Sequence, residues 1–194
     1  MTEILSSKEH FEKYSNRLQR ILASTKWHDV AQLASDLLLC WQNKSHVYIC
    51  GNGGSAGNAN HLANDFIYGI AKSTGAGLRI TSLSANASVI TCLANDVGYE
   101  SIYSEQLAVL GQKNDLLIVL SGSGNSPNIV KVLEQAKKMD LKSYAITGYD
   151  GGICKQIADV SIHFSVKDMQ IAEDLQLISG HMIMQWLYDN KNKT

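Results

Sequence analysis

Several features that would direct this chain to membranes, nucleic acids or the secretory route are scarce or missing. A single proline, Pro127, leaves little room for extended linkers, and no run of eighteen apolar residues predicts a membrane-spanning helix. The opening MTEILSSKEHFEKY carries acids and bases where a signal peptide would be apolar. With a net charge of -1, the chain has no electrostatic reason to bind nucleic acid or an anionic membrane. We expect a cytosolic protein.

Cysteines are few, and their spacing excludes a C-x-x-C motif. The 4 cysteines could form two disulfides, but Cys50 ends an apolar run and Cys40 lies on the apolar face of a predicted helix. Reduced thiols in the core of a cytosolic protein are the favoured interpretation, with disulfides as the alternative.

The length of 194 residues predicts one domain covering 1–194, because that is enough chain to bury a single core. Apolar residues recur at helical spacing over 7–23 and 28–42. These two amphipathic helices form an N-terminal extension, residues 1–44, which we expect to pack on the rest of the domain or on a neighbouring subunit.

After the extension, short apolar runs alternate with helical patterns. This alternation predicts an α/β fold, a doubly wound, flavodoxin-like sheet of five parallel strands with helices on both faces. Ligands of such sheets bind beyond the carboxyl ends of the strands. The predicted strands are 46–50, 78–83, 115–121, 143–147 and 160–166, and the predicted helices are 56–70, 86–110, 126–139, 152–157 and 170–190.

Two loops rich in glycine or serine follow predicted strands and open predicted helices. The first, GNGGSAGN (51–58), could bind an anion through free backbone N–H groups at the helix start. It loosely matches a dinucleotide pattern, but the second strand ends in SLSANAS, without an acidic residue to hold a ribose. The second, SGSGNSPN (121–128), offers three hydroxyls and Ser126 as an N-cap. An ordinary capped turn is the alternative, yet two such loops favour a small phosphorylated ligand.

The motifs GNGGSA, AND-x-G (94–98), SGSGNSPN and TGYDGG (147–152) occur in this order at predicted strand ends. Together they resemble the sugar isomerase (SIS) family, and more narrowly its phosphoheptose isomerases. The resemblance covers essentially the whole chain. It implies a homotetramer with sites shared between subunits, and residues that hold the sugar phosphate. The matching positions at the phosphate are Ser121, Gly122, Ser123, Asn125 and Ser126, and those at the sugar are Asn52, Gly53, Ser55, Asp96 and Glu173.

The resemblance also implies a zinc site held by His61, Asp65, Glu173 and His181, one ion per subunit, with Asp65 and His181 as the catalytic base and acid. His61 and Asp65 are four residues apart, and Glu173 and His181 are eight apart, so each pair shares a helix face. Moving a proton between C1 and C2 of a sugar through an enediol needs a base at carbon and an acid at oxygen. Two imidazoles and two carboxylates also suit zinc, which would polarise the carbonyl.

The chain departs from the family pattern at three places. Asp65 replaces a glutamate, which shortens the side chain by one methylene, and Glu173 replaces a glutamine, which adds a negative charge. Family members carry an arginine near Gly69 that helps to bind the phosphate; here Lys72 is the alternative cation. These changes point to a divergent member with an altered substrate or without the isomerase reaction.

We expect a phosphosugar isomerase that interconverts sedoheptulose 7-phosphate and an aldose heptose 7-phosphate, in lipopolysaccharide or capsule heptose synthesis. One alternative is a non-catalytic tetrameric relative that binds sugar phosphates or associates with the bacterial replication initiator. A regulatory sugar-phosphate sensor is another, although no DNA-binding segment accompanies the domain.

Overall fold

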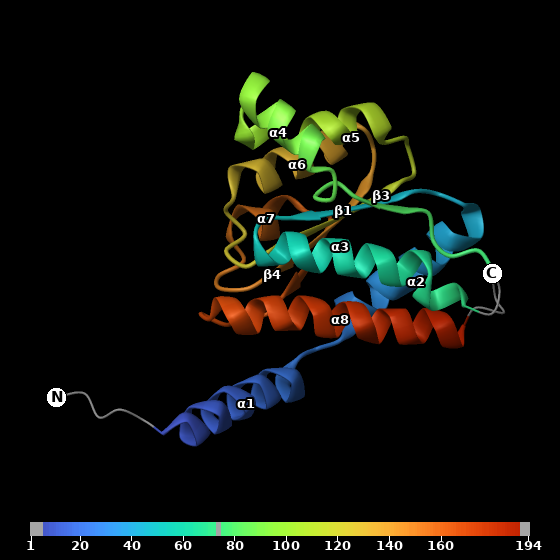
Figure 1. The fold of residues 1–194 in the computed structure, drawn as a ribbon. Coiled ribbons are helices and arrows are strands. Elements are labelled where there is room, and N and C mark those ends of the chain that lie inside the picture. Colours follow the sequence, from blue (N-terminus) through green and yellow to red (C-terminus); the bar gives the residue numbers. More distant parts are fainter. Residues whose placement is uncertain (1–5, 73–74, 191–194) are drawn as a thin grey trace.

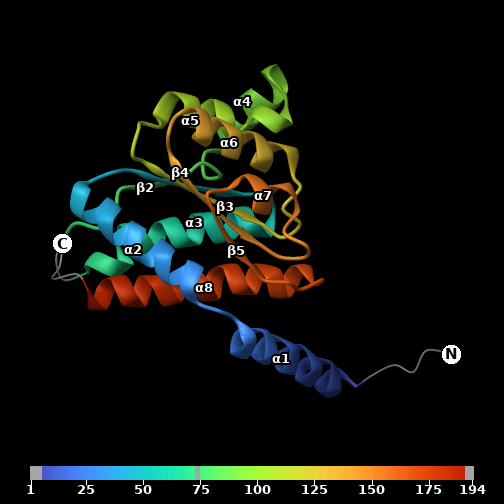
Figure 2. The ribbon, with the colours of Figure 1, turned by 180° about the vertical axis from the view of Figure 1, so that it is seen from behind.

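The computed structural model describes residues 6–72 and 75–190, so the ends of the predicted domain, 1–5 and 191–194, lie outside the described residues. Its five strands form one parallel sheet in the order β2-β1-β3-β4-β5 (Figures 1 and 2). β2 is added on one side of β1, and β3, β4 and β5 are added on the other side. The ligand-binding crevice of this fold lies where the strand order switches sides, between β1 and β3. The strands are β1 (Val47–Gly51), β2 (Ile80–Ser82), β3 (Leu116–Ser121), β4 (Lys142–Thr147) and β5 (Val160–His163).

Both faces of the sheet are covered, and the strands alternate between two separate cores. Val47 and Ile49 of β1 point into the core that contains α2, α3 and α8, whereas Tyr48 and Cys50 point into the core beneath α5, α6 and α7. Figure 1 shows α3 and α8 on one side of the sheet and α4, α5 and α6 on the other. The helices are α1 (Ser7–Ser24), α2 (His28–Asn43), α3 (Gly54–Ile67), α4 (Ala87–Asp96), α5 (Ser104–Leu110), α6 (Pro127–Lys138), α7 (Gly152–Ile157) and α8 (Met169–Asp189), with short 3₁₀ turns η1 (Gly69–Ala71) and η2 (Tyr99–Ser101).

The two N-terminal helices pack differently. α2 buries one apolar face in the first core, through residues such as Leu33 and Leu37. α1 begins at a capping box between Ser6 and Glu9, contains no fully buried residue and extends away from the body of the molecule in both ribbon views (Figures 1 and 2). α1 packs more lightly on the same core through partly buried residues such as Leu18 and Leu22, and Arg17 donates to Asp168 beside α8. Contact of the extension with a neighbouring subunit stays a prediction.

The predicted helix 86–110 was wrong as a single element. The chain breaks into α4, η2 and α5, and the break lies at Gly98, whose φ of 117° no helical residue adopts. The apolar spacing continued through the break because both pieces face the same core. The runs 78–83 and 160–166 were also too long as strands, because only 80–82 and 160–163 pair with a neighbouring strand.

The other predicted elements are confirmed within a few residues. All four cysteines are free; three are buried, but Cys92 on α4 is exposed and not a core thiol. Among the described residues, no helix combines the length and apolar character needed to cross a bilayer.

Candidate active site

The loop after β1 is held in place by a network centred on Asn52. The Asn52 and Asn128 side chains exchange two amide hydrogen bonds, each 2.8 Å long, which join the loop to the first turn of α6. Tyr99 donates from its hydroxyl to Asn52 Oδ1 at 3.2 Å, and Tyr103 donates to the carbonyl of Gly51. Burial raises the pKa of Tyr103 to about 12, so its phenol remains a donor at neutral pH. The Asn52 side chain therefore anchors the crevice between β1 and β3.

A carboxylate covers the start of the helix that follows this loop. A Cβ placed on Gly54 would come within 2.3 Å of Glu173 Oε2, so the Glu173 side chain occupies the space above the first turn of α3. The N-terminus of a helix carries partial positive charge and free N–H groups, which favour a negative group there. A carboxylate of α8 therefore lies beside the first turn of α3.

The loop after β3 is arranged by its own side chains. Ser121 Oγ accepts from Gly124 N at 3.0 Å, and Ser123 Oγ accepts from Asn125 N at 3.3 Å. Asn125 Oδ1 accepts from Ile153 N at 3.1 Å, which ties the loop to the first turn of α7. Ser126 is the N-cap of α6, as predicted, but its hydroxyl makes no capping hydrogen bond. That hydroxyl and the α6 N-terminus offer donors to an anion.

The same loop depends on a glycine at 124. Gly124 has φ of +68°, and a Cβ there would lie 2.0 Å from the carbonyl oxygen of Gly151. This close approach lets Cys154 N donate to Gly124 O at 2.9 Å. The backbone of the second loop is therefore fixed from two sides before any ligand binds.

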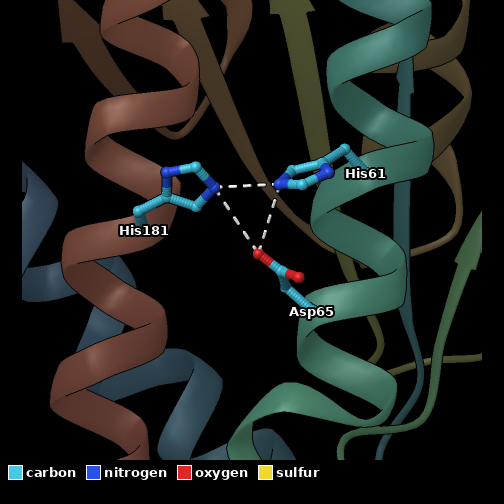
Figure 3. Close-up of side chains that lie close together, drawn as sticks. All are labelled: His61, Asp65 and His181. Atoms are coloured by element: carbon cyan, nitrogen blue, oxygen red, sulfur yellow. Dashed lines mark hydrogen bonds and ion pairs between the residues drawn. The ribbon is translucent and has the colours of Figure 1, made fainter.

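Two neighbouring helices bring together three of the predicted catalytic and metal-binding residues (Figure 3). His61 Nε2 and His181 Nε2 are 2.9 Å apart, and Asp65 Oδ2 lies 3.4 Å from the first and 3.5 Å from the second. His61 and Asp65 face the same way because four residues complete one turn of α3. The imidazoles are half exposed, while the Asp65 side chain is only 18% exposed. The shorter aspartate still reaches both imidazoles.

These three side chains can hold a metal ion, since each offers a ligand atom and all three atoms lie within 4.8 Å of one another. Glu173 is not part of this group. Its carboxylate lies over Gly54, and the step of eight residues from Glu173 to His181 advances α8 by about 12 Å. A shared helix face therefore does not place Glu173 and His181 on one ion within one chain.

The remaining predicted residues are more scattered. Ser55 is buried under the first loop, and a Cβ on Gly122 would lie 2.3 Å from Met169 Sδ. Asp96 ends α4, and its carboxylate accepts from Asn95 Nδ2 at 2.7 Å. Lys72 lies with its Nζ 5.9 Å from the centre of the Tyr68 ring.

Sequence reasoning assigned no role at the site to Asn128 or Tyr99. Both contact Asn52 from positions far along the chain, so no local sequence motif indicates their role. The only local signal was the position of Asn128 in the first turn after the serine loop.

A model of the SIS domain matches residues 9–148 of this chain. The chain belongs to the SIS domain family. The phosphoheptose isomerase of Helicobacter pylori (strain ATCC 700392 / 26695) is 35% identical over 181 residues, covering 93% of this chain and 90% of the relative. The phosphoheptose isomerase of Chlorobaculum parvum is 35% identical over 176 residues, covering 89% and 83% of the two chains.

Solved structures of SIS proteins share the fold described above. Phosphoheptose isomerase GmhA from Neisseria gonorrhoeae superposes with a TM-score of 0.86 at 26% identity, covering 94% of this chain and 98% of that one. A phosphoheptose isomerase from Francisella tularensis gives the same TM-score at 24% identity, with 96% and 100% covered, and supports the fold alone. The predicted fold class is confirmed.

Proposed function

We propose that this SIS protein is an aldose–ketose isomerase that interconverts sedoheptulose 7-phosphate and an aldose heptose 7-phosphate through an enediol. The observation that carries this function is the meeting of His61, Asp65 and His181 on α3 and α8, in a chain whose relatives over most of its length are phosphoheptose isomerases. The substrate is a small phosphorylated sugar.

The reaction transfers a proton between neighbouring carbons, and Asp65 and His181 suit the two halves of that transfer. Asp65 turns Oδ2 toward both imidazoles, and Oδ1, which accepts only a long hydrogen bond of 3.5 Å from Asn64 Nδ2, is the oxygen that would take the proton from carbon. His181 would supply the proton that the carbonyl oxygen takes up as the enediol forms, from the ring nitrogen that does not hold the ion, and the roles reverse in the second half. Positioned acid–base groups of this kind contribute on the order of 10²- to 10⁴-fold to rate.

Zinc fits the donor set of this group. Two imidazole nitrogens and one carboxylate oxygen match a catalytic zinc site with three protein ligands and an open position. The ion, when bound, would act as a Lewis acid on the sugar carbonyl. His61, Asp65 and His181 would hold it, and we propose one ion per subunit.

The phosphate is assigned to the loop after β3. The Ser126 hydroxyl and the N-terminus of α6 are open to a dianion, and the backbone of the loop is already fixed by Gly124 and Asn125. The first loop would then lie at the sugar, where the Glu173 carboxylate accepts hydrogen bonds from hydroxyl groups.

The position of Glu173 supports a site that is shared between subunits. We propose a homotetramer with sites at subunit interfaces, in which Glu173 of a second copy approaches the His61–Asp65–His181 group that the first copy's Glu173 cannot reach. Mixing two inactive variants, Glu173→Ala and His181→Ala, and allowing subunits to exchange should restore roughly a quarter of the sites if each site draws on two chains. No recovery in demonstrably mixed oligomers would contradict shared sites.

We further propose a cytosolic protein that serves heptose synthesis for lipopolysaccharide or capsule. Its four free cysteines support a reducing compartment.

The direct test is to incubate the purified chain with sedoheptulose 7-phosphate and zinc, and to follow the aldose product by NMR. The matched variants Asp65→Asn and His181→Gln keep the side-chain size and should each lower kcat by at least about 100-fold. Absence of turnover in the zinc-supplied wild-type protein would overturn the proposed reaction. Binding of the sugar phosphate without conversion would instead identify a non-catalytic member of the family.

A further inference from the structure

The helices that carry the candidate ligands lie side by side (Figure 3), and the colours of Figure 1 show that they run in the same direction. Contacts between α3 and α8 follow the same order along both helices: Gly54 faces Glu173, and Leu62 packs on Gly180. A Cβ on Gly180 would lie 2.3 Å from Leu62 Cδ2, so these backbones approach closely. Any sliding of one helix along the other would change the distance between His61 and His181.

A polar side chain, Asn58, bridges α3 and α8 between these two contacts. Asn58 Nδ2 donates to Gln176 Oε1 at 3.0 Å and to the backbone carbonyl of Glu173 at 3.0 Å. Gln176 is 1% exposed, and its Nε2 has no hydrogen-bond partner among the described residues. Burying an amide with an unpaired donor costs about 1–3 kcal/mol, so an apolar residue at 176 would suit a purely structural interface better.

The amide pair also differs from the apolar contacts in directionality. Leucine and methionine side chains tolerate shifts along a helix, whereas a hydrogen bond weakens steeply when its length or angle changes. The bond from Asn58 to Gln176 therefore specifies one register of α3 against α8. Asn58 is three residues before His61, and Gln176 is five before His181, so this register is set close to the ligands.

We propose that Asn58 and Gln176 are positioning residues for the His61–Asp65–His181 group. They touch neither the ion nor the reacting atoms; they fix the relative height of the helices that present the imidazoles. This inference rests on the proposed metal site, and it assigns the polar pair a role beyond folding stability. Outer residues that orient metal ligands typically contribute 10- to 100-fold to metal affinity.

The test compares Asn58→Ala, Gln176→Leu and the double variant with Ser179→Ala. Ser179 is a matched control, because it is buried on the same helix but donates to Leu175 O at 2.7 Å within α8 itself. Zinc binding to the full chain is measured by calorimetry, and thermal unfolding is followed in parallel. The histidine ring nitrogens of the metal-free protein are observed by NMR, since the contact between His61 and His181 should give a distinctive pair of signals.

We expect each single variant to bind zinc about tenfold more weakly than wild type. The double variant should lose little more than Asn58→Ala, because that change already removes both hydrogen bonds from Asn58 to α8. Both single variants should also lose the paired histidine signals, whereas Ser179→Ala should keep wild-type zinc affinity and signals.

Wild-type zinc affinity and histidine signals in both single variants would overturn the inference, as would an equal loss in Ser179→Ala. Should wild type convert no sugar, or bind no zinc, the proposed function or metal would fail, and the histidine signals would still decide the role of the pair.

Discussion

The two loops that look most alike in the sequence have different groups beside their helix N-termini in the structure. Both follow adjacent strands, β1 and β3, and both open helices. The Glu173 carboxylate lies beside Gly54 in the first turn of α3, whereas the first turn of α6 presents the Ser126 hydroxyl, which makes no capping hydrogen bond. Two loops of similar composition therefore present different groups to a ligand.

The difference comes from elements far away in the chain. Glu173 belongs to the last helix, and the contact that fixes the second loop comes from the first turn of α7. A negative side chain at a helix N-terminus contributes about 0.3–1 kcal/mol of stability at the surface, and it repels a phosphate at the same place. Four substitutions test this contrast.

Gly124→Ala should have the largest effect on stability, because it strains the backbone of the second loop. Alanine at a φ of +68° costs about 1–2 kcal/mol, and its Cβ would overlap the Gly151 carbonyl at 2.0 Å. We expect a loss of about 3 kcal/mol in the free energy of unfolding, seen as a Tm lower by roughly 6–12 °C. Gly57→Ala is the control, since nothing lies within 4 Å of its Cβ and alanine favours the helix. Equal Tm values for the two variants would show that the second loop is not fixed by this contact.

Ser126→Ala should affect binding and spare stability. Removal of a hydrogen bond to a charged phosphate costs about 1.5–3 kcal/mol, so KM for the sugar phosphate should rise at least about tenfold with kcat almost unchanged. Steady-state kinetics measure this, with Ser35→Ala on the exposed face of α2 as the comparison. An unchanged KM would remove the second loop from the phosphate site.

Gly54→Ala should push the carboxylate off the first loop. The new Cβ would come within 2.3–2.5 Å of the Glu173 carboxyl group, which can rotate away. We expect a loss of about 1 kcal/mol in urea unfolding. In a Glu173→Ala background the same change should be neutral or stabilising, because alanine has the better helix propensity. A cost that persists in that background would point to another contact.

Glu173→Gln should have the smallest effect on stability. It keeps the side-chain shape and removes the charge, so the loss should be about 0.3–1 kcal/mol at low salt and less at high salt, where the interaction with the helix dipole is screened. Denaturation at two ionic strengths measures the difference. A loss that does not depend on salt would mean that packing, and not charge, holds Glu173 over Gly54.

The α/β alternation predicted the sheet, and the strand ends predicted where polar residues gather. This worked because hydrophobic periodicity is local and parallel strands align their carboxyl ends. The helix over 86–110 failed for the opposite reason, since the left-handed conformation of Gly98 was not required by the apolar spacing around it. Within one chain the structure brings together His61, Asp65 and His181 and leaves Glu173 apart, because residues that share a helix face can still lie far apart along the helix axis.

Residue spacing along the chain is enough to identify the available side chains: His61 and Asp65 one turn apart, His181 on a mostly apolar helix, and serines after β3. The parallel contact of α3 and α8, which brings His61 and His181 within 2.9 Å, is seen only in the folded domain. The same holds for the position of Glu173 over the first loop. Spacing along one helix follows from backbone geometry, whereas contacts between helices depend on the packing of side chains that lie over a hundred residues apart.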